Sequence, residues 1–131
     1  MSTKQIGSFG EKIAEDYLKN KGYQILDKNY SFRIPGNPQK GEIDIIAKKS
    51  DTIIFVEVKT LAKNIEEWSS TILPEDKVNF SKQRKLIKTA ESWLMKNKTS
   101  LNSQWQIDVI AIKIDLSNKK AKIRHLKNAV F

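Results

Sequence analysis

The sequence predicts a mixed α/β (α+β) domain, in which helices flank a β-sheet and the elements follow in the order α-β-β-β-α-β-β. Three observations support this. Two segments carry apolar residues at helical spacing, several short runs are rich in β-branched and aromatic residues, and turn-forming residues separate them. A length of 131 residues suits one hydrophobic core, so we expect a single domain over residues 1–131.

The chain begins with an expected helix at residues 7–21, followed by a strand at residues 23–32. Gly22 stands where a residue in the left-handed conformation often ends a helix. The Pro- and Gly-containing segment 34–38 then breaks any regular element. The apolar residues at helical spacing are Phe9, Ile13, Ala14, Tyr17 and Leu18.

Two β-type segments, residues 42–47 and 52–60, are joined by the polar residues 48–51, a connection length typical of an antiparallel hairpin. Both segments are almost continuously apolar apart from a few charges. Strands of this composition are typical of a sheet that is covered on both faces. We therefore expect the hairpin at the middle of the fold.

The second half of the chain is expected to hold one helix and two strands. Residues 61–73 show no clear period, and Pro74, followed by two acids, is typical of a first helical turn. The helix would run to about Lys98, and strands would follow at residues 105–114 and 121–125. The expected buried positions of this helix are Phe80, Ile87, Ala90, Trp93 and Leu94.

The composition favours a polyanionic partner and excludes several kinds of site. The chain has 24 Lys and Arg against 15 Asp and Glu, a formal net charge of +9. This charge favours nucleic acid, although lysines can also serve solvation alone, and charge separates nucleic acid poorly from a membrane surface. Without cysteine, disulfides, thiolate metal sites and cysteine nucleophiles are excluded. We find no signal peptide and no membrane-spanning run, and expect a cytoplasmic protein without a membrane partner.

Three charged residues interrupt the two central strands. Side chains two apart on a strand share a face, so Glu57 and Lys59 lie side by side, and the hairpin could set Asp44 opposite or diagonal to Glu57. Carboxylate and carbonyl oxygens are the ligands that Mg²⁺ prefers, which makes Asp44, Glu57 and the main-chain carbonyl of Val58 candidate metal ligands. Lys59 could hold or deprotonate an attacking water. The pattern therefore indicates metal-dependent hydrolysis of a phosphodiester.

The same residues also have a plainer interpretation. In a chain in which 30% of the residues are charged, an Asp and a Glu-x-Lys arise easily by chance and could form an exposed charge pattern or a structural salt bridge. Their position argues against this, because the flanking residues suit a sheet interior and burying unpaired charge is costly. We favour a functional site by about three to one.

The two strand segments resemble the signature strands of a known family. GEIDIIA at residues 41–47 and FVEVKT at residues 55–60 are similar to those of the small bacterial YraN-like proteins, in the PD-(D/E)XK nuclease superfamily. Residues 7–18 look like that family's opening helix, and residues 107–110 and 125–129 like its closing strands, so the resemblance spans nearly the whole chain. It implies a restriction-endonuclease-like fold.

The resemblance also implies roles for single residues. Asp44, Glu57 and Lys59 match the catalytic positions of the superfamily, and Glu11 matches an acid on the first helix that sometimes completes the metal site. On sequence grounds alone, Glu11 is as readily interpreted as a solvated acid beside Lys12.

Substrate contacts are inherited less directly. Lys82 and Gln83 resemble polar residues that the superfamily's second helix points toward the substrate, but an amphipathic helix always has such residues to spare. Leu61 stands where the superfamily usually has Arg, and the segments 34–39 and 65–76 depart from the pattern on either side of the expected cleft.

Several other residues invite a structural interpretation. His125 is the only histidine, so a His-based zinc site or catalytic triad is not expected. Asp108 lies in an apolar strand, where we expect a buried hydrogen-bonding partner of a basic residue rather than a metal ligand. Trp93 and Trp105 occupy apolar positions and are expected in the core, whereas Trp68 is a candidate for contact with a base.

These observations lead to one hypothesis and two rivals. We expect an endonuclease that depends on Mg²⁺ or Mn²⁺, hydrolyses phosphodiester bonds in DNA and selects its target by structure, in the manner of a resolvase. The rivals are a non-catalytic nucleic-acid-binding module on the nuclease scaffold and a basic protein-interaction domain, and a homodimer stays open as the assembly. The expected nucleic-acid contacts are Arg33, Lys63, Lys82, Gln83 and Arg84.

Overall fold

The computed structural model describes residues 2–38, 40–63, 80–99 and 103–130, with the main chain alone at Lys63 and Val130. Its elements are α1 (Thr3–Asn20), β1 (Gln24–Arg33), β2 (Lys40–Lys49), β3 (Thr52–Lys63), α2 (Phe80–Lys96), β4 (Trp105–Asp115) and β5 (Lys120–Val130). The predicted mixed α/β class and the order α-β-β-β-α-β-β are therefore confirmed.

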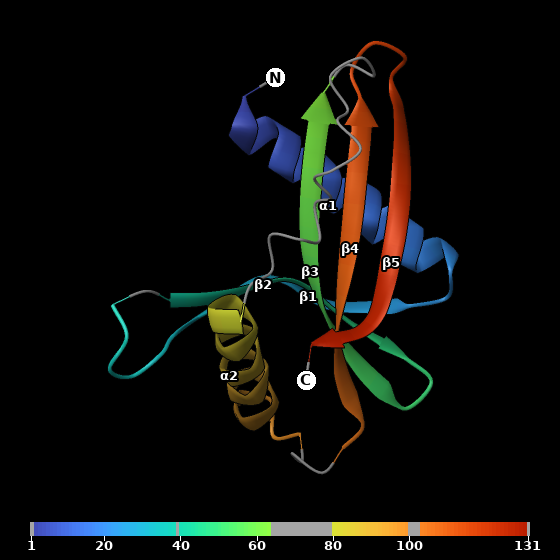
Figure 1. Ribbon diagram of the computed structural model, residues 1–131. Helices are drawn as coiled ribbons and strands as arrows, with labels where there is room; N and C mark the ends of the chain where they lie inside the picture. The colour runs from blue at the N-terminus through green and yellow to red at the C-terminus, as the bar shows by residue number, and fades with distance from the viewer. Residues whose placement is uncertain (1, 39, 64–79, 100–102, 131) are drawn as a thin grey trace.

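The five strands form one sheet in the order β1-β2-β3-β4-β5, so β2 and β3 are interior strands, as the sequence predicted. Strand β3 runs parallel to β4, and every other neighbouring pair is antiparallel. A parallel pair needs a crossover, and α2 lies in the connection between β3 and β4. The helices lie on opposite faces of the sheet, with α2 in front and α1 behind in Figure 1. We call these the α1 face and the α2 face.

Each face of the sheet buries its own apolar cluster. Alternate side chains of a strand point to opposite faces, so the almost continuous apolar runs of β3 and β4 supply both clusters. On the α1 face, the cluster includes Ala14, Leu18, Ile45, Val56, Val58, Ile110 and Ile112. On the α2 face, it includes Ile43, Ile46, Phe55, Leu86, Ala90, Trp93, Leu94, Ile107 and Val109.

Helix α1 begins at Thr3, four residues before the predicted start at residue 7. Ser2 caps it, because the Ser2 Oγ accepts the Gln5 N–H and the Gln5 side chain accepts the Ser2 N–H, a reciprocal capping box. At the other end Gly22 has φ +90°, as predicted for the residue that ends the helix. Phe9 is 44% exposed, in contrast to the apolar positions nearer the middle of the helix.

Helix α2 is described from Phe80, so the predicted helix start at Pro74 lies outside the described residues. The prediction that Phe80 is buried is wrong: its side chain is 73% exposed, and the guanidinium of Arg84 lies 5.9 Å from the centroid of its ring. Ala90, Trp93 and Leu94 are buried as predicted. Neither α1 nor the described part of α2 is long and apolar enough to cross a membrane.

Two glycines let the helices approach the sheet closely. A Cβ at Gly10 would collide with the Thr60 side chain on β3, and a Cβ at Gly41 on β2 would collide with the Thr89 side chain on α2. Only glycine leaves room for such contacts. Both helices therefore lie against the part of the β2–β3 hairpin that carries the charged residues.

Candidate active site

The strands β2 and β3 part at Asp44. Their pairing runs from the turn as far as Ile45 opposite Val56 and ends there. Ile43 belongs to the cluster on the α2 face and Ile45 to the cluster on the α1 face, although residues two apart in a regular strand share a face. The strand is therefore irregular at Asp44, and the Asp44 Oδ2 accepts the N–H of Val58 on β3 at 2.7 Å. The carboxylate of Asp44 thus lies in the gap between the two strands.

The carbonyl of Val58 faces the same gap. In a strand, the N–H and the C=O of one residue leave the backbone on the same side, which is how a residue exchanges both bonds with one partner. Because the Val58 N–H points at Asp44, its carbonyl points to the β2 side, beyond the last β2–β3 pair. This oxygen could serve as a ligand beside the Asp44 carboxylate.

Glu57 holds two lysines on a single oxygen. The Glu57 Oε1 lies 3.3 Å from the Lys59 Nζ and 3.0 Å from the Lys82 Nζ. Glu57 and Lys59 come from β3, where they share a face, whereas Lys82 reaches the acid from the first turns of α2. Glu57 is only 5% exposed, whereas the side chains of Lys59 and Lys82 are 19% and 36% exposed, so the cluster on the α2 face joins a buried acid to two partly exposed amines.

Asp44 is a partly buried acid whose surroundings favour its neutral form. Burial, the neighbouring Glu57 and, more weakly, Glu11 raise the pKa of Asp44, which lies at about 7. The Val58 N–H and Lys82 oppose this rise but do not cancel it. Near neutral pH the site is therefore poised to take up a cation or a proton.

The two lysines respond differently to the same surroundings. Burial and the adjacent Lys82 lower the pKa of Lys59, against the attraction of Glu57. Burial also disfavours the charged form of Lys82, but its hydrogen bond with Lys59 and the attraction of Glu57 raise the pKa of Lys82 overall. Lys82 is thus the fixed cation of the site, and Lys59 is the amine that gives up its proton more readily.

Glu11 approaches Asp44 from the α1 side of the gap. The two residues line a common small hollow, and burial, Glu57 and Glu42 raise the pKa of Glu11. The structure does not bring Glu11 into a side-chain ligand set: among the described residues, no three His, Cys, Asp or Glu side chains are grouped so as to hold a metal ion. The ligand set that the geometry offers is two carboxylates and one main-chain carbonyl.

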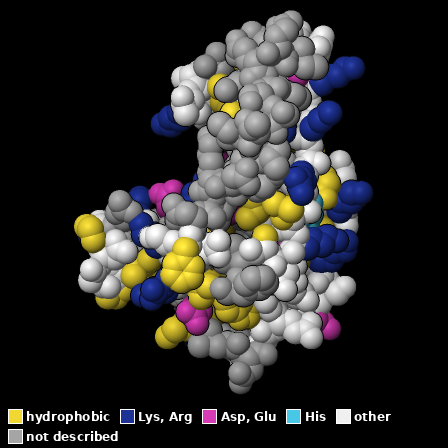
Figure 2. Space-filling view, viewed as in Figure 1, with side chains coloured by type: hydrophobic (Ala, Val, Ile, Leu, Met, Phe, Trp, Pro, Cys, Tyr) yellow, Lys and Arg dark blue, Asp and Glu magenta, His cyan; other side chains and the backbone are white. Residues whose placement is uncertain are grey.

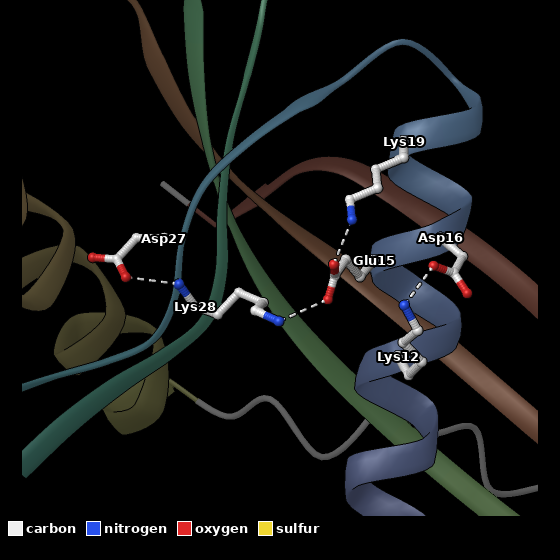
Figure 3. A network of polar contacts seen from close by, with 6 residues as sticks. All are labelled: Lys12, Glu15, Asp16, Lys19, Asp27 and Lys28. Atoms are coloured by element: carbon white, nitrogen blue, oxygen red, sulfur yellow. Dashed lines mark hydrogen bonds and ion pairs between the residues drawn. The ribbon is translucent and has the colours of Figure 1, made fainter.

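A neighbouring acid on α1, Glu15, is fully paired. Lys19 lies 2.7 Å from one of its carboxylate oxygens and Lys28 of β1 lies 3.0 Å from the other, and these lysines lower the pKa of Glu15 to about 2. Figure 3 shows Lys28 reaching Glu15 across from β1, and Lys12 turned to Asp16 at 3.1 Å. Lys12 is thus engaged with Asp16 rather than with the adjacent Glu11.

Asp44, Glu57 and Lys82 line a polar hollow of about 470 Å³ between the β2–β3 hairpin and α2. We call it the site hollow; its lining residues are Lys40, Gly41, Glu42, Asp44, Glu57, Ser81, Lys82, Lys85 and Leu86. Lys85 was not among the predicted contacts, although its spacing of three from Lys82 places both lysines on one side of a helix. The predicted contact Lys82 lies in the hollow itself.

Two of the other predicted nucleic-acid contacts, Arg84 and Arg33, lie at or next to a second hollow beside α2. Arg84 lines this second hollow, of about 300 Å³, together with Lys85 and Lys88 of α2. Arg33 is exposed at the end of β1, next to Ile34, which lines the same second hollow. Gln83 is half-buried on α2. The side chain of Lys63 and the whole of Trp68 lie outside the described residues.

A different polar network lies on the α1 face. Asp108 Oδ1 accepts hydrogen bonds from the Gln106 side chain and the Asn128 N–H, and Asp108 Oδ2 pairs with His125 Nε2 at 2.7 Å. The other ring nitrogen of His125 lies 3.0 Å from the Tyr17 hydroxyl of α1. The prediction that Asp108 is a buried partner of a basic residue is confirmed. His125 lies in this network on the α1 face and does not line the site hollow.

Two tryptophans pack where the sequence placed them. The rings of Trp93 and Trp105 both meet Phe55 edge-on, with centroids 5.8 and 5.7 Å away. These contacts are typical of core aromatics rather than of base-stacking platforms.

Comparison with known proteins identifies close relatives of unassigned activity. The model of the uncharacterised protein family UPF0102 matches residues 10–112, a range that includes every acid and lysine of the site. A UPF0102 protein of Alkaliphilus oremlandii is 41% identical over 126 residues, covering 96% of this chain and 97% of the relative. A UPF0102 protein of Clostridium botulinum strain 657 is also 41% identical over 126 residues, with 96% and 94% of the two chains covered.

Proposed function

We propose that the chain, which belongs to the uncharacterised protein family UPF0102, is a divalent-metal-dependent endonuclease that hydrolyses phosphodiester bonds in DNA and selects its target by structure. One observation carries the proposal: Asp44 and Glu57 line one polar hollow, Lys59 lies 3.3 Å from the Glu57 Oε1, and the pKa of Asp44, in the gap between β2 and β3, is raised to about 7. Such perturbed, partly buried groups in a hollow are typical of a catalytic site.

The residues present fit a hard cation such as Mg²⁺ or Mn²⁺. Asp44 and Glu57 offer carboxylate oxygens, and the carbonyl of Val58 points into the same gap. Burial and the negative charge of Glu57 raise the pKa of Asp44, and a bound cation would stabilise the charged form of this acid. When bound, the ion supplies charge neutralisation at the scissile phosphate.

The lysines of the site divide the remaining work. Lys59 has a lowered pKa and is held beside Glu57, so its Nζ can accept a proton from the water that attacks the phosphorus. Lys82 keeps its charge and can bind a non-bridging phosphate oxygen from the α2 side. Glu57 orients both amines through its Oε1.

The charge distribution supports DNA as the partner. A net charge of +9 favours a polyanion, and Lys40, Lys82 and Lys85 line the site hollow. Contacts of lysines with phosphates carry no direct sequence information, so a surface that binds mainly through such contacts selects by shape and carries little sequence preference. Branched or distorted DNA would then be recognised in preference to a regular duplex.

A second candidate function is a non-catalytic nucleic-acid-binding module on the same scaffold. The observation that favours it is the pairing of Glu57 with both lysines, which neutralises that acid without a metal ion. Such a protein would keep salt-sensitive binding to nucleic acid and would cleave no substrate.

Both candidates are tested by one set of reactions. The protein is incubated with branched, single-stranded and duplex DNA in Mg²⁺, in Mn²⁺ and in EDTA, beside the Glu57→Gln and Lys59→Ala variants. Asp16→Asn and Lys48→Ala are matched controls, since both residues are exposed and lie outside the site hollow. The endonuclease predicts cleavage that needs metal, falls at least ~100-fold in both site variants and persists in both controls.

Three other outcomes are decisive. Cleavage that survives in EDTA, or that the controls lose as fully as the site variants, contradicts the proposed chemistry. Salt-sensitive binding without cleavage in either metal supports the binding module instead. Absence of binding at low salt contradicts both candidates.

A further inference from the structure

The pairing of β3, β4 and β5 places basic residues in line with Lys59 across the sheet. Lys59 on β3 pairs with Ala111 on β4, and Ala111 pairs with Arg124 on β5. Directly paired residues share a face, so Arg124 lies on the α2 face, two strands away from Lys59. In the next row on that face, Leu61 pairs with Lys113, and Lys113 pairs with Lys122.

The pairing of Lys113 with Lys122 sets two like charges opposite each other. Cross-strand neighbours have Cβ atoms about 5 Å apart, and like charges in this position destabilise the sheet. Among the ion pairs between described residues, none involves Lys113 or Lys122. The fold thus keeps a repulsive pair where an acid on either strand would have removed it.

Strand β5 directs Ile123 and His125 to one face of the sheet and its basic residues Lys122 and Arg124 to the other. Ile123 and His125 pair with Ile112 and Ile110 of the cluster on the α1 face, so the basic residues between and beside them point to the α2 face. Lys122 and Arg124 are exposed. Figure 2, which looks onto the α2 face, shows dark blue side chains along the margin where Figure 1 has β5.

We propose that Lys113, Lys122 and Arg124, which we call the basic strip, bind the phosphate backbone of the nucleic acid as it leaves the site. Strands lie about 4.8 Å apart and rise about 3.4 Å per residue. The Cα atom of Arg124 is therefore about 10 Å from the Cα atom of Lys59, and the Cα atom of Lys122 is about 7 Å further along β5. These spacings suit contacts with several phosphates of one strand, which follow one another at about 3.4 Å along a stacked helix.

The basic strip and α2 place positive charge on two sides of Glu57. Lys82 and Arg84 lie on the α2 side, and the strip lies across β4 on the other side. A nucleic acid that touches both must pass over the site, so the arrangement fits cleavage within a strand rather than removal of a terminal nucleotide. The inference rests on the proposed function, because it takes the site hollow as the place of reaction.

The test measures DNA binding without cleavage. Fluorescence anisotropy with a labelled duplex in EDTA, over a series of salt concentrations, compares the wild type with Lys122→Gln/Arg124→Gln and with the matched control Lys48→Gln/Lys98→Gln. Each phosphate contact contributes about 0.9 to the slope of log K against log salt. The strip variant is expected to bind at least ~10-fold more weakly at low salt, with a slope smaller by about 1 to 2, and the control is expected to bind like the wild type.

A Lys122→Glu variant separates binding from folding. It places an acid opposite Lys113, so its melting temperature is expected to rise while its affinity for DNA falls. If the strip variant and the control bind equally well, the strip is not a binding surface and the proposed function stands. If the wild type itself shows no salt-sensitive binding, the proposed function fails together with the strip.

Discussion

The two faces of the sheet each carry a cluster of ionisable groups, and the clusters differ in how well their charges are satisfied. On the α1 face, burial would raise the pKa of Asp108, but hydrogen bonds from His125, the Asn128 N–H and Gln106 together lower it. Beside the site hollow, Asp44 lies in the gap between β2 and β3 with the Val58 N–H as its hydrogen-bond donor, and burial and nearby acids raise its pKa.

The contrast shows that two aspartates, Asp108 and Asp44, can have different roles. A buried carboxylate with several donors stabilises the charged form and ties β4 to β5, and through His125 to α1. A carboxylate left short of positive charge costs stability in the free protein and gains it when a cation arrives. We interpret the first cluster as structural and the second as a site, and the following predictions can break or sharpen that distinction.

The largest expected effect is on stability, from Asp108→Asn. The substitution removes the charge that His125, Gln106 and the Asn128 N–H all contact, and loss of one member of a buried pair typically costs about 3 kcal/mol or more. Urea unfolding at neutral pH measures it. The exposed Asp16→Asn should cost less than about 0.5 kcal/mol, and an equal cost for the two would remove the structural role assigned to Asp108.

Asp44→Asn should raise the stability of the protein, in contrast to Asp108→Asn. The pKa of Asp44 is about 7 in the folded chain against an ordinary 3.8, so between these values the folded state holds a proton that the unfolded state has lost. Wild-type stability is therefore expected to fall as pH rises from about 4 to about 7. The Asn variant lacks this loss and should be more stable at pH 8 by about 1 to 2 kcal/mol. Unfolding of both proteins across this range checks it, and a destabilised variant at pH 8 would contradict the account.

A smaller effect is expected from Lys82→Met in metal binding. Lys82 shares the Glu57 Oε1 with Lys59, and its removal leaves that acid with less positive charge. We expect Mn²⁺ to bind about five-fold more tightly, a gain of about 1 kcal/mol, as measured by calorimetry. Lys88→Met on the exposed side of the same helix should change nothing. Weaker binding in Lys82→Met would mean that the lysine holds the acid in place instead of competing with the ion.

The smallest effect is expected from Glu15→Gln. Lys19 and Lys28 lower the pKa of Glu15 to about 2, so its contribution to stability is present above the ordinary value of 4.5 and is lost as pH falls toward 2. Both lysines are about half exposed, which limits the cost of the substitution to about 1 kcal/mol at neutral pH. Denaturation curves for the two proteins should converge near pH 2, and a constant difference would contradict the assignment.

Much of the fold could be predicted because its signals are local. The period of two along β3 placed Glu57 and Lys59 on one face, and the strand motifs pointed to the family to which the chain belongs. Two local errors had readable causes. The start of α1 depends on the Ser2-x-x-Gln5 capping box, which lies before the first apolar residue of the helical pattern, and Phe80 is apolar but exposed, which its residue type alone does not indicate.

Parts of the site could not be predicted because they depend on tertiary contacts. Nothing in the sequence says that the pairing of β2 with β3, followed from the turn, ends at Ile45. This break puts Asp44 in the gap beside Val58. The reach of Lys82 to Glu57 depends on how closely α2 packs on the sheet, which the contact at Gly41 permits. Likewise, Tyr17 and His125 are 108 residues apart in the chain and meet only in the fold.

The most direct test is a carboxyl carbon NMR titration of the protein with and without Mg²⁺. The account predicts that Asp44 titrates near pH 7 in the metal-free protein and moves far below that value when Mg²⁺ is saturating, while Asp108 stays below its ordinary pKa in both conditions. An Asp44 that titrates near its ordinary 3.8 and ignores Mg²⁺ would contradict the claim that this acid belongs to a cation site.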